Sequence, residues 1–121
     1  MELKQLFRVT GVANQIAYDS GLASTETEKK RLLYVGIQVT GYSDNDVQGY
    51  HERAKVFDIP DTLIDVELPT FIEDESKPGP RITQVEVGLD IPVGETFKTA
   101  IKSGATPNDL KGFYAYELMG G

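Results

Sequence analysis

The sequence of 121 residues contains no cysteine, no tryptophan and a single histidine, His51. A chain without cysteine has no disulfide framework, no thiolate metal site and no thiol nucleophile. One imidazole cannot build a multi-histidine metal site, and no Gly-x-Ser-x-Gly elbow accompanies it for a catalytic triad. We therefore predict a protein that is not an enzyme and carries no cofactor. A glycosidase-type carboxylate pair, which leaves no pattern in a sequence, stays open.

Long apolar runs are also missing. No stretch approaches the roughly 18 apolar residues of a membrane-spanning helix, so we predict no membrane span. Charges at Glu2, Lys4 and Arg8 interrupt the first segment and exclude the apolar centre of a signal peptide. If the chain starts at its natural residue, we expect it in the cytoplasm or in a virus particle.

Basic residues are scarce, with 12 Lys and Arg against 19 Asp and Glu and a net charge of −7. Nucleic-acid binding needs clustered cations, so we predict none. The charges are uneven, because residues 56–76 hold seven carboxylates and no cation whereas three basic residues are adjacent earlier. These blocks are either solvated edges or an interaction surface. The candidate surface comprises Lys29, Lys30, Arg31, Asp58, Asp61, Asp65, Glu67, Glu73, Asp74 and Glu75.

Two segments alternate apolar and polar side chains, residues 82–92 and residues 31–41. A period of two indicates a strand with one buried face. We also predict strands over residues 3–13, 47–57, 63–68 and 112–119, a hairpin over residues 32–57, and loops over residues 17–30 and 73–81. Residues 95–103 fit either a strand or a short helical turn, and residues 106–110 fit a single helical turn.

Many short strands separated by turn residues, with no long amphipathic helix, favour an all-β fold. We predict one domain over residues 1–121, an antiparallel β-sandwich of jelly-roll type with at most one short helical segment. The predicted core is Val9, Leu33, Val35, Ile37, Val39, Val56, Val66, Val85, Val87, Leu89 and Ile91.

Two local patterns are candidate sites. Asp44, Asp46, Gln48 and Gly49 match the first half of a calcium-binding EF-hand loop, but Lys55 stands where the bidentate glutamate is needed. An Asx-rich turn explains the stretch better. His51, beside charged neighbours, is interpreted as a solvent-facing side chain.

Two functions remain. Opposite charge blocks on neighbouring copies could fix the register of a symmetric oligomer, which favours a self-associating structural protein such as a capsid or accessory virion component. The alternative is a carbohydrate-binding module in which Tyr42 and Tyr50 stack against sugar rings.

Overall fold

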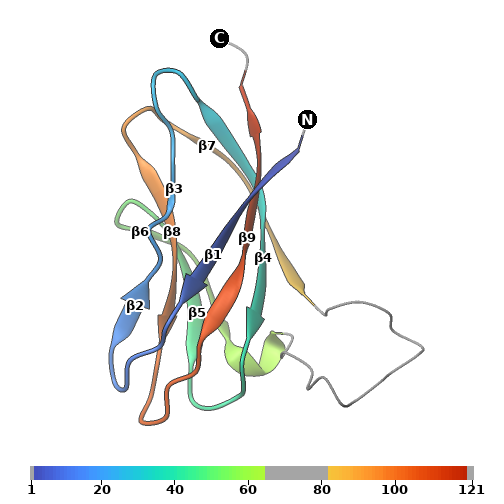
Figure 1. Ribbon diagram of the computed structural model, residues 1–121. Coiled ribbons are helices and arrows are strands. Elements are labelled where there is room, and N and C mark those ends of the chain that lie inside the picture. Colours follow the sequence, from blue (N-terminus) through green and yellow to red (C-terminus); the bar gives the residue numbers. More distant parts are fainter. Residues whose placement is uncertain (1, 65–81, 120–121) are drawn as a thin grey trace, which may run out of the picture.

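The computed structural model describes residues 2–64 and 82–119 and consists of two antiparallel sheets packed face to face (Figure 1). This confirms the predicted all-β sandwich. The described elements are β1 (Leu3–Val9), β2 (Ile16–Tyr18), β3 (Leu22–Ala23), β4 (Lys30–Val39), β5 (Asp46–His51), β6 (Ala54–Pro60), the 3-10 helix η1 (Asp61–Leu63), β7 (Thr83–Ile91), β8 (Thr96–Lys102) and β9 (Leu110–Leu118).

The strands divide into sheet A, in the order β1-β9-β4-β7, and sheet B, in the order β2-β8-β5-β6 with β3 also paired to β8. The chain crosses repeatedly between the sheets, so strands distant in sequence become neighbours. The first strand pairs with the last, β1 with β9, and β4 pairs with β7. No helix in the described ranges is long and apolar enough to cross a membrane.

The segment with the strictest alternation, β7, forms one edge of sheet A, and β4 and β9 form its centre. Val85, Val87 and Leu89 pack against the core while remaining partly exposed, and Ile91 is fully buried. The polar residues between them face solvent. Charged outward side chains on an exposed edge strand oppose pairing with other chains.

The core lies between the sheets. Five predicted core residues are fully or almost fully buried: Val9, Val35, Ile37, Val39 and Ile91. Among the described residues, eight further members of the buried core were not in the prediction, namely Leu22, Leu32, Val47, Ile64, Phe97, Ile101, Leu110 and Tyr114. The predicted core residue Val66 lies outside the described residues.

The prediction that Leu33 is a core residue is wrong. A β-bulge shifts the register of β4 between Leu32 and Tyr34 against both neighbouring strands. After the bulge the odd-numbered residues of β4 face the core, but before it the even-numbered residues do. Leu32 is therefore fully buried and Leu33 is only half-buried. A bulge places two residues of one strand opposite one of its partner, and alternation alone does not reveal where this happens.

Val56 is 44% exposed, so its predicted core position is also wrong. The register of β5 and β6 shifts between Gly49 and Tyr50, and beyond this irregularity Phe57 and Ile59 turn inward against the core. The Phe57 ring occupies the space over Gly49, where an added Cβ would come within 2.2 Å of it. Glycine is therefore required at this close approach.

Two predicted connections are wrong. Residues 32–57 do not form a hairpin, because β4 belongs to sheet A and β5 to sheet B. The hairpin is instead β5–β6, which turns at Glu52 with a positive φ of 57°. The predicted loop over residues 17–30 overlaps the end of β2 and contains β3, and Leu22 of β3 is fully buried. Strands of two or three residues are too short to show a period.

Residues 95–103 resolve as a strand, β8, whose Phe97, Thr99 and Ile101 face the core. The helical turn predicted over residues 106–110 is not formed, and the short helix is η1. Pro60 ends β6 as predicted, because proline offers no N–H to a ladder. Of the strand predicted over residues 63–68, the structure describes two residues: Leu63, which belongs to η1, and Ile64, which follows it. Residues 65–68 and the loop predicted over residues 73–81 fall outside the described residues.

Candidate functional site

The three adjacent basic residues separate in the structure. Lys29 is exposed. Lys30 is buried, and its Nζ donates a hydrogen bond to the backbone carbonyl of Ala23 at 2.6 Å. Arg31 pairs with Asp90 of β7, with 2.7 Å between Nη1 and Oδ1. The expected exposure of Lys30 is wrong because alternate side chains of β4 turn inward.

The acidic block is also divided. Asp58 of β6 is exposed and lies 3.0 Å from Nζ of Lys55. Asp61 is buried and accepts hydrogen bonds from the backbone N–H of Ser43 and the side-chain amide of Asn45. Asp61 therefore stabilises the loop that crosses between the sheets, and its predicted place on an interaction surface is wrong. The other acidic members of the block, Asp65, Glu67, Glu73, Asp74 and Glu75, fall outside the described residues.

The stretch that resembles half of a calcium loop begins in this crossing loop and continues into β5. The Asn45 amide is committed to Asp61, and Gly49 lies within the strand against Phe57. Within residues 2–64 and 82–119, no group of three or more His, Asp or Glu side chains is placed to hold a metal ion.

His51 ends β5 and is largely shielded, with 22% of its side chain exposed. Its Nε2 lies 2.7 Å from Oε1 of Glu95. The expected solvent-facing position is wrong. His51 lies opposite the buried Phe97 in the β5–β8 ladder, so its side chain is on the face of β5 that is turned toward the other sheet. This contact links the last residue of β5 to the residue that precedes β8.

Asp19 is a buried carboxylate that sequence analysis missed. Its Oδ1 accepts hydrogen bonds of 2.8 Å from the Thr99 backbone N–H and the Tyr114 hydroxyl, and its Oδ2 accepts one of 3.0 Å from Gly21. Burial and the nearby Asp19 carboxylate raise the pKa of the Tyr114 hydroxyl. Because Thr99 belongs to sheet B and Tyr114 to sheet A, this group connects the two sheets.

The two tyrosines predicted to bind sugar do not share a site. Tyr42 lines a cleft beside the crossing loop, and its hydroxyl donates to the backbone carbonyl of Ile64. Tyr50 lines another cleft, on the outer face of sheet B. Its aromatic partner there is Tyr18 of β2, a residue that no sequence pattern indicated.

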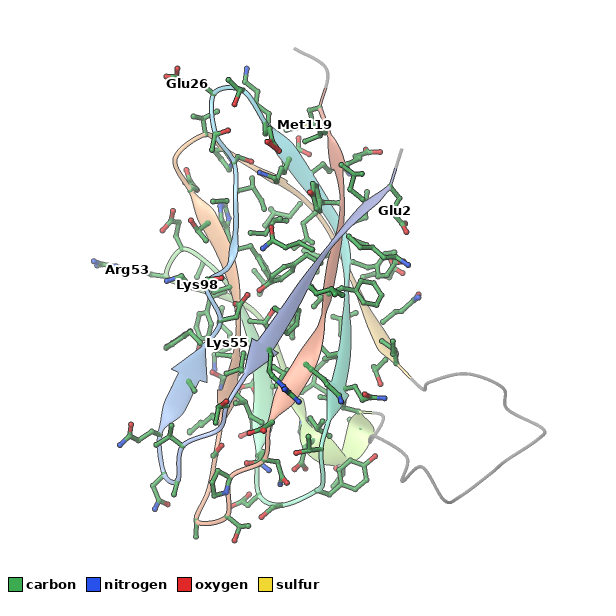
Figure 2. All side chains as sticks on the ribbon, in the orientation of Figure 1. Glu2, Glu26, Arg53, Lys55, Lys98 and Met119 are labelled. Carbon is green, nitrogen blue, oxygen red and sulfur yellow. The ribbon has the colours of Figure 1, made fainter. Side chains whose placement is uncertain are left out.

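The Tyr18–Tyr50 cleft has a volume of about 330 Å³ and is lined by Tyr18, Tyr50, Glu52, Arg53 and Lys98. The ring centroids of the tyrosines are 5.7 Å apart and the rings are inclined at 60°. Figure 2 shows Arg53 and Lys98 projecting from the same side of the sandwich, away from sheet A. The cleft therefore combines aromatic surface with charge of both signs.

The outer face of sheet A has an apolar patch, which comprises Leu6, Ile82 and Phe113. Leu6 is 80% exposed, the largest exposed fraction among the exposed apolar side chains of the described residues. The patch borders a depression of about 330 Å³. Glycine at position 36 permits this arrangement, since an added Cβ would come within 2.6 Å of the Phe113 ring and 3.1 Å of Ile82.

The two ends of this face differ in charge, and a further cation, Lys4 of β1, lies between them with its Nζ 4.8 Å from the centre of the Phe113 ring. At one end, Arg8 of β1 lies opposite Lys111 of β9 in the β-ladder, so two basic residues are neighbours there. At the other end Glu2 precedes Leu3, whose ladder partner is Tyr116, so Glu2 lies near Glu117. The Tyr34 hydroxyl donates to Glu2 at 3.3 Å, which places Glu2 on the outer face as well (Figure 2).

No known protein family, curated protein sequence or solved structure matches this chain. Function must therefore be inferred from the two outer faces of the sandwich.

Proposed function

We propose that this chain is a non-enzymatic structural subunit that self-associates through the outer face of sheet A, as a capsid or accessory component of a virus particle does. The observation that carries the proposal is the apolar patch, centred on the 80% exposed Leu6, between a basic end and an acidic end of one sheet. Exposed apolar surface rimmed by charge is typical of protein interaction sites.

The distribution of charge supports a two-fold symmetric contact between copies. Because β1 and β9 are antiparallel neighbours, their basic residues Arg8 and Lys111 share one end of the face, and their acidic residues Glu2 and Glu117 share the other. A two-fold axis in the plane of the face, perpendicular to the strands, places the basic end of each copy over the acidic end of the other. Isologous contacts of this kind use the same surface twice.

The strand order supports a jelly roll, the fold class that capsid subunits often use. Successive ladders join β1 to β9, β2 and β3 to β8, β4 to β7, and β5 to β6. This nested pairing is what results when a long antiparallel ribbon is rolled into two sheets. The link from this fold to virus particles is an analogy, and assembly itself rests on the sheet A surface.

Sedimentation velocity across a range of protein concentration tests the assembly. We expect an oligomer that Leu6→Asp dissociates, because the substitution places a charge in the contact. Leu63 is the matched control, since it is also a strongly exposed leucine, at 71%, but belongs to η1. Leu63→Asp should leave the oligomer intact. A wild-type protein that stays monomeric at millimolar concentration, or an oligomer unaffected by Leu6→Asp, would refute the proposal.

A charge exchange tests the two-fold geometry. Arg8→Glu should weaken association because it opposes the acidic end of the partner, and Glu2→Arg in the same chain should restore it. Circular dichroism checks that each variant folds, so that a loss of association is not mistaken for unfolding. A double variant that associates no better than Arg8→Glu alone would contradict the proposed axis.

A further inference from the structure

The Tyr18–Tyr50 cleft belongs to the other sheet, and its shape follows from the ladder. Tyr18 is the ladder partner of Ala100, and Tyr50 is the partner of Lys98 two residues earlier on the same strand. The two rings therefore meet diagonally across β8. Ala100, which lies beneath them on β8, is fully buried.

Hydrogen bonds hold the walls of the cleft in position. The Tyr50 hydroxyl donates to Oε1 of Gln48 at 2.5 Å, which orients the ring. Oε1 of Glu52 accepts a hydrogen bond of 3.1 Å from the backbone N–H of Thr96, which anchors the β5–β6 turn over β8. The two lining cations, Arg53 and Lys98, extend into solvent from this fixed frame (Figure 2). A binding site that is already ordered loses less entropy when a ligand binds.

The cleft is positive in a chain whose net charge is −7. Its lining includes two cations, Arg53 and Lys98, and one carboxylate, Glu52, so the formal charge of the lining is +1. Nearby, Lys55 and Asp58 neutralise each other at 3.0 Å. An excess of cations at an aromatic cleft on an acidic protein favours an anionic ligand, and guanidinium groups bind carboxylates in a bidentate geometry.

The inclination of the rings decides between ligand shapes. A planar base or aromatic ring is best held between two parallel faces, whereas these rings form a wedge of 60°. A pyranose ring can lay its C–H face on one tyrosine and direct hydroxyl groups toward the other phenol. A volume of about 330 Å³ lies at the small end of the range for ligand sites.

We propose that the Tyr18–Tyr50 cleft binds a carboxylated sugar, such as a uronate or sialic acid unit of a glycan. Tyr18 and Tyr50 contact the faces of the sugar ring, and Arg53 and Lys98 bind its carboxylate. The cleft lies on sheet B, so this binding is independent of the association proposed for sheet A, and either can fail without the other.

Isothermal titration calorimetry with an oligogalacturonate and with sialyllactose tests the proposal. The neutral references are the same oligogalacturonate after reduction of its carboxyl groups, and lactose. We expect at least one acidic sugar to bind and its neutral reference to bind at least about tenfold more weakly, because the charged contact is lost. Absence of binding by both acidic sugars, or equal binding of a neutral reference, would overturn the proposal.

Matched variants locate the site. Lys98→Gln should weaken binding of the acidic sugar about tenfold, and Lys102→Gln should not, because Lys102 is exposed on the same strand but does not line the cleft. Tyr18→Ala should weaken it to a similar extent, whereas Tyr42→Ala should not. Circular dichroism confirms that each variant folds. Equal losses from Lys98→Gln and Lys102→Gln would show attraction by general charge and would overturn the assignment.

Discussion

Replacing Asp19 by alanine should destabilise the protein by about 2–6 kcal/mol, a large part of the roughly 5–15 kcal/mol that stabilises an ordinary domain. The magnitude follows from the donors that lose their acceptor. The Thr99 backbone N–H and the Tyr114 hydroxyl each donate to Asp19 at 2.8 Å, and both residues are fully buried. An unsatisfied buried donor costs about 1–3 kcal/mol. Gly21 is half-buried and water can replace its bond.

Asp19→Asn distinguishes the hydrogen-bond argument from simple loss of volume. The amide oxygen can still accept from Thr99 and Tyr114, while the amide nitrogen would face the Gly21 N–H, and two donors would meet. We expect a cost of about 1–2 kcal/mol, smaller than for alanine. Asp58→Ala is the control and should have little effect, because that carboxylate is exposed and, within the described part of the chain, its polar partners are Lys55 and Gln48.

Urea denaturation followed by far-ultraviolet circular dichroism measures these changes, and an unchanged m-value shows that compactness is preserved. A second substitution provides an internal test. Tyr114→Phe should destabilise the wild-type protein but be neutral or stabilising beside Asp19→Ala, where it removes a hydroxyl without a partner. If Asp19→Ala costs less than about 1 kcal/mol, or no more than Asp19→Asn, the reasoning is refuted.

Two further predictions concern the bulge and alkaline pH. Leu32→Asp should unfold the protein because it buries an unpaired charge, whereas Leu33→Asp should be far milder; equal effects in thermal melting would contradict the bulge. The raised pKa of Tyr114 means that the folded protein keeps this proton above pH 10 while the unfolded chain releases it, so this group lowers stability by about 1.4 kcal/mol per pH unit there. Tyr114→Phe should therefore flatten the alkaline decline in stability, and identical slopes would count against the buried phenol.

Much of the fold could be predicted because strands leave a local pattern. Alternation over residues 82–92 and 31–41 predicted β7 and β4, and Pro60 marked the end of β6. The lack of any long amphipathic pattern predicted the all-β class. Each of these features depends on side chains adjacent in the chain, since a strand buries every second residue whichever partner it finds.

Sequence analysis did not reach the candidate site, because the site depends on strand pairing. Tyr18 and Tyr50 are separated by 31 intervening residues and meet only because β2 and β5 both pair with β8. No local signal distinguishes Tyr18 from a tyrosine in a loop, and Tyr42, which the sequence favoured equally, lines a different cleft.

The same reason explains the errors in burial. Leu32, Leu33 and Tyr34 are all apolar or aromatic, so the sequence permits either one to face the core, and the bulge in the folded sheet places Leu32 there. Lys30 and Asp61 were expected at the surface and Asp19 was not singled out, yet each side chain is buried and hydrogen-bonded to another part of the chain. The sequence alone determined which segments are extended and one-sided. Tertiary structure decided which strands pair, which polar groups are satisfied inside, and which surfaces remain to bind, because those outcomes depend on contacts between residues far apart in the chain.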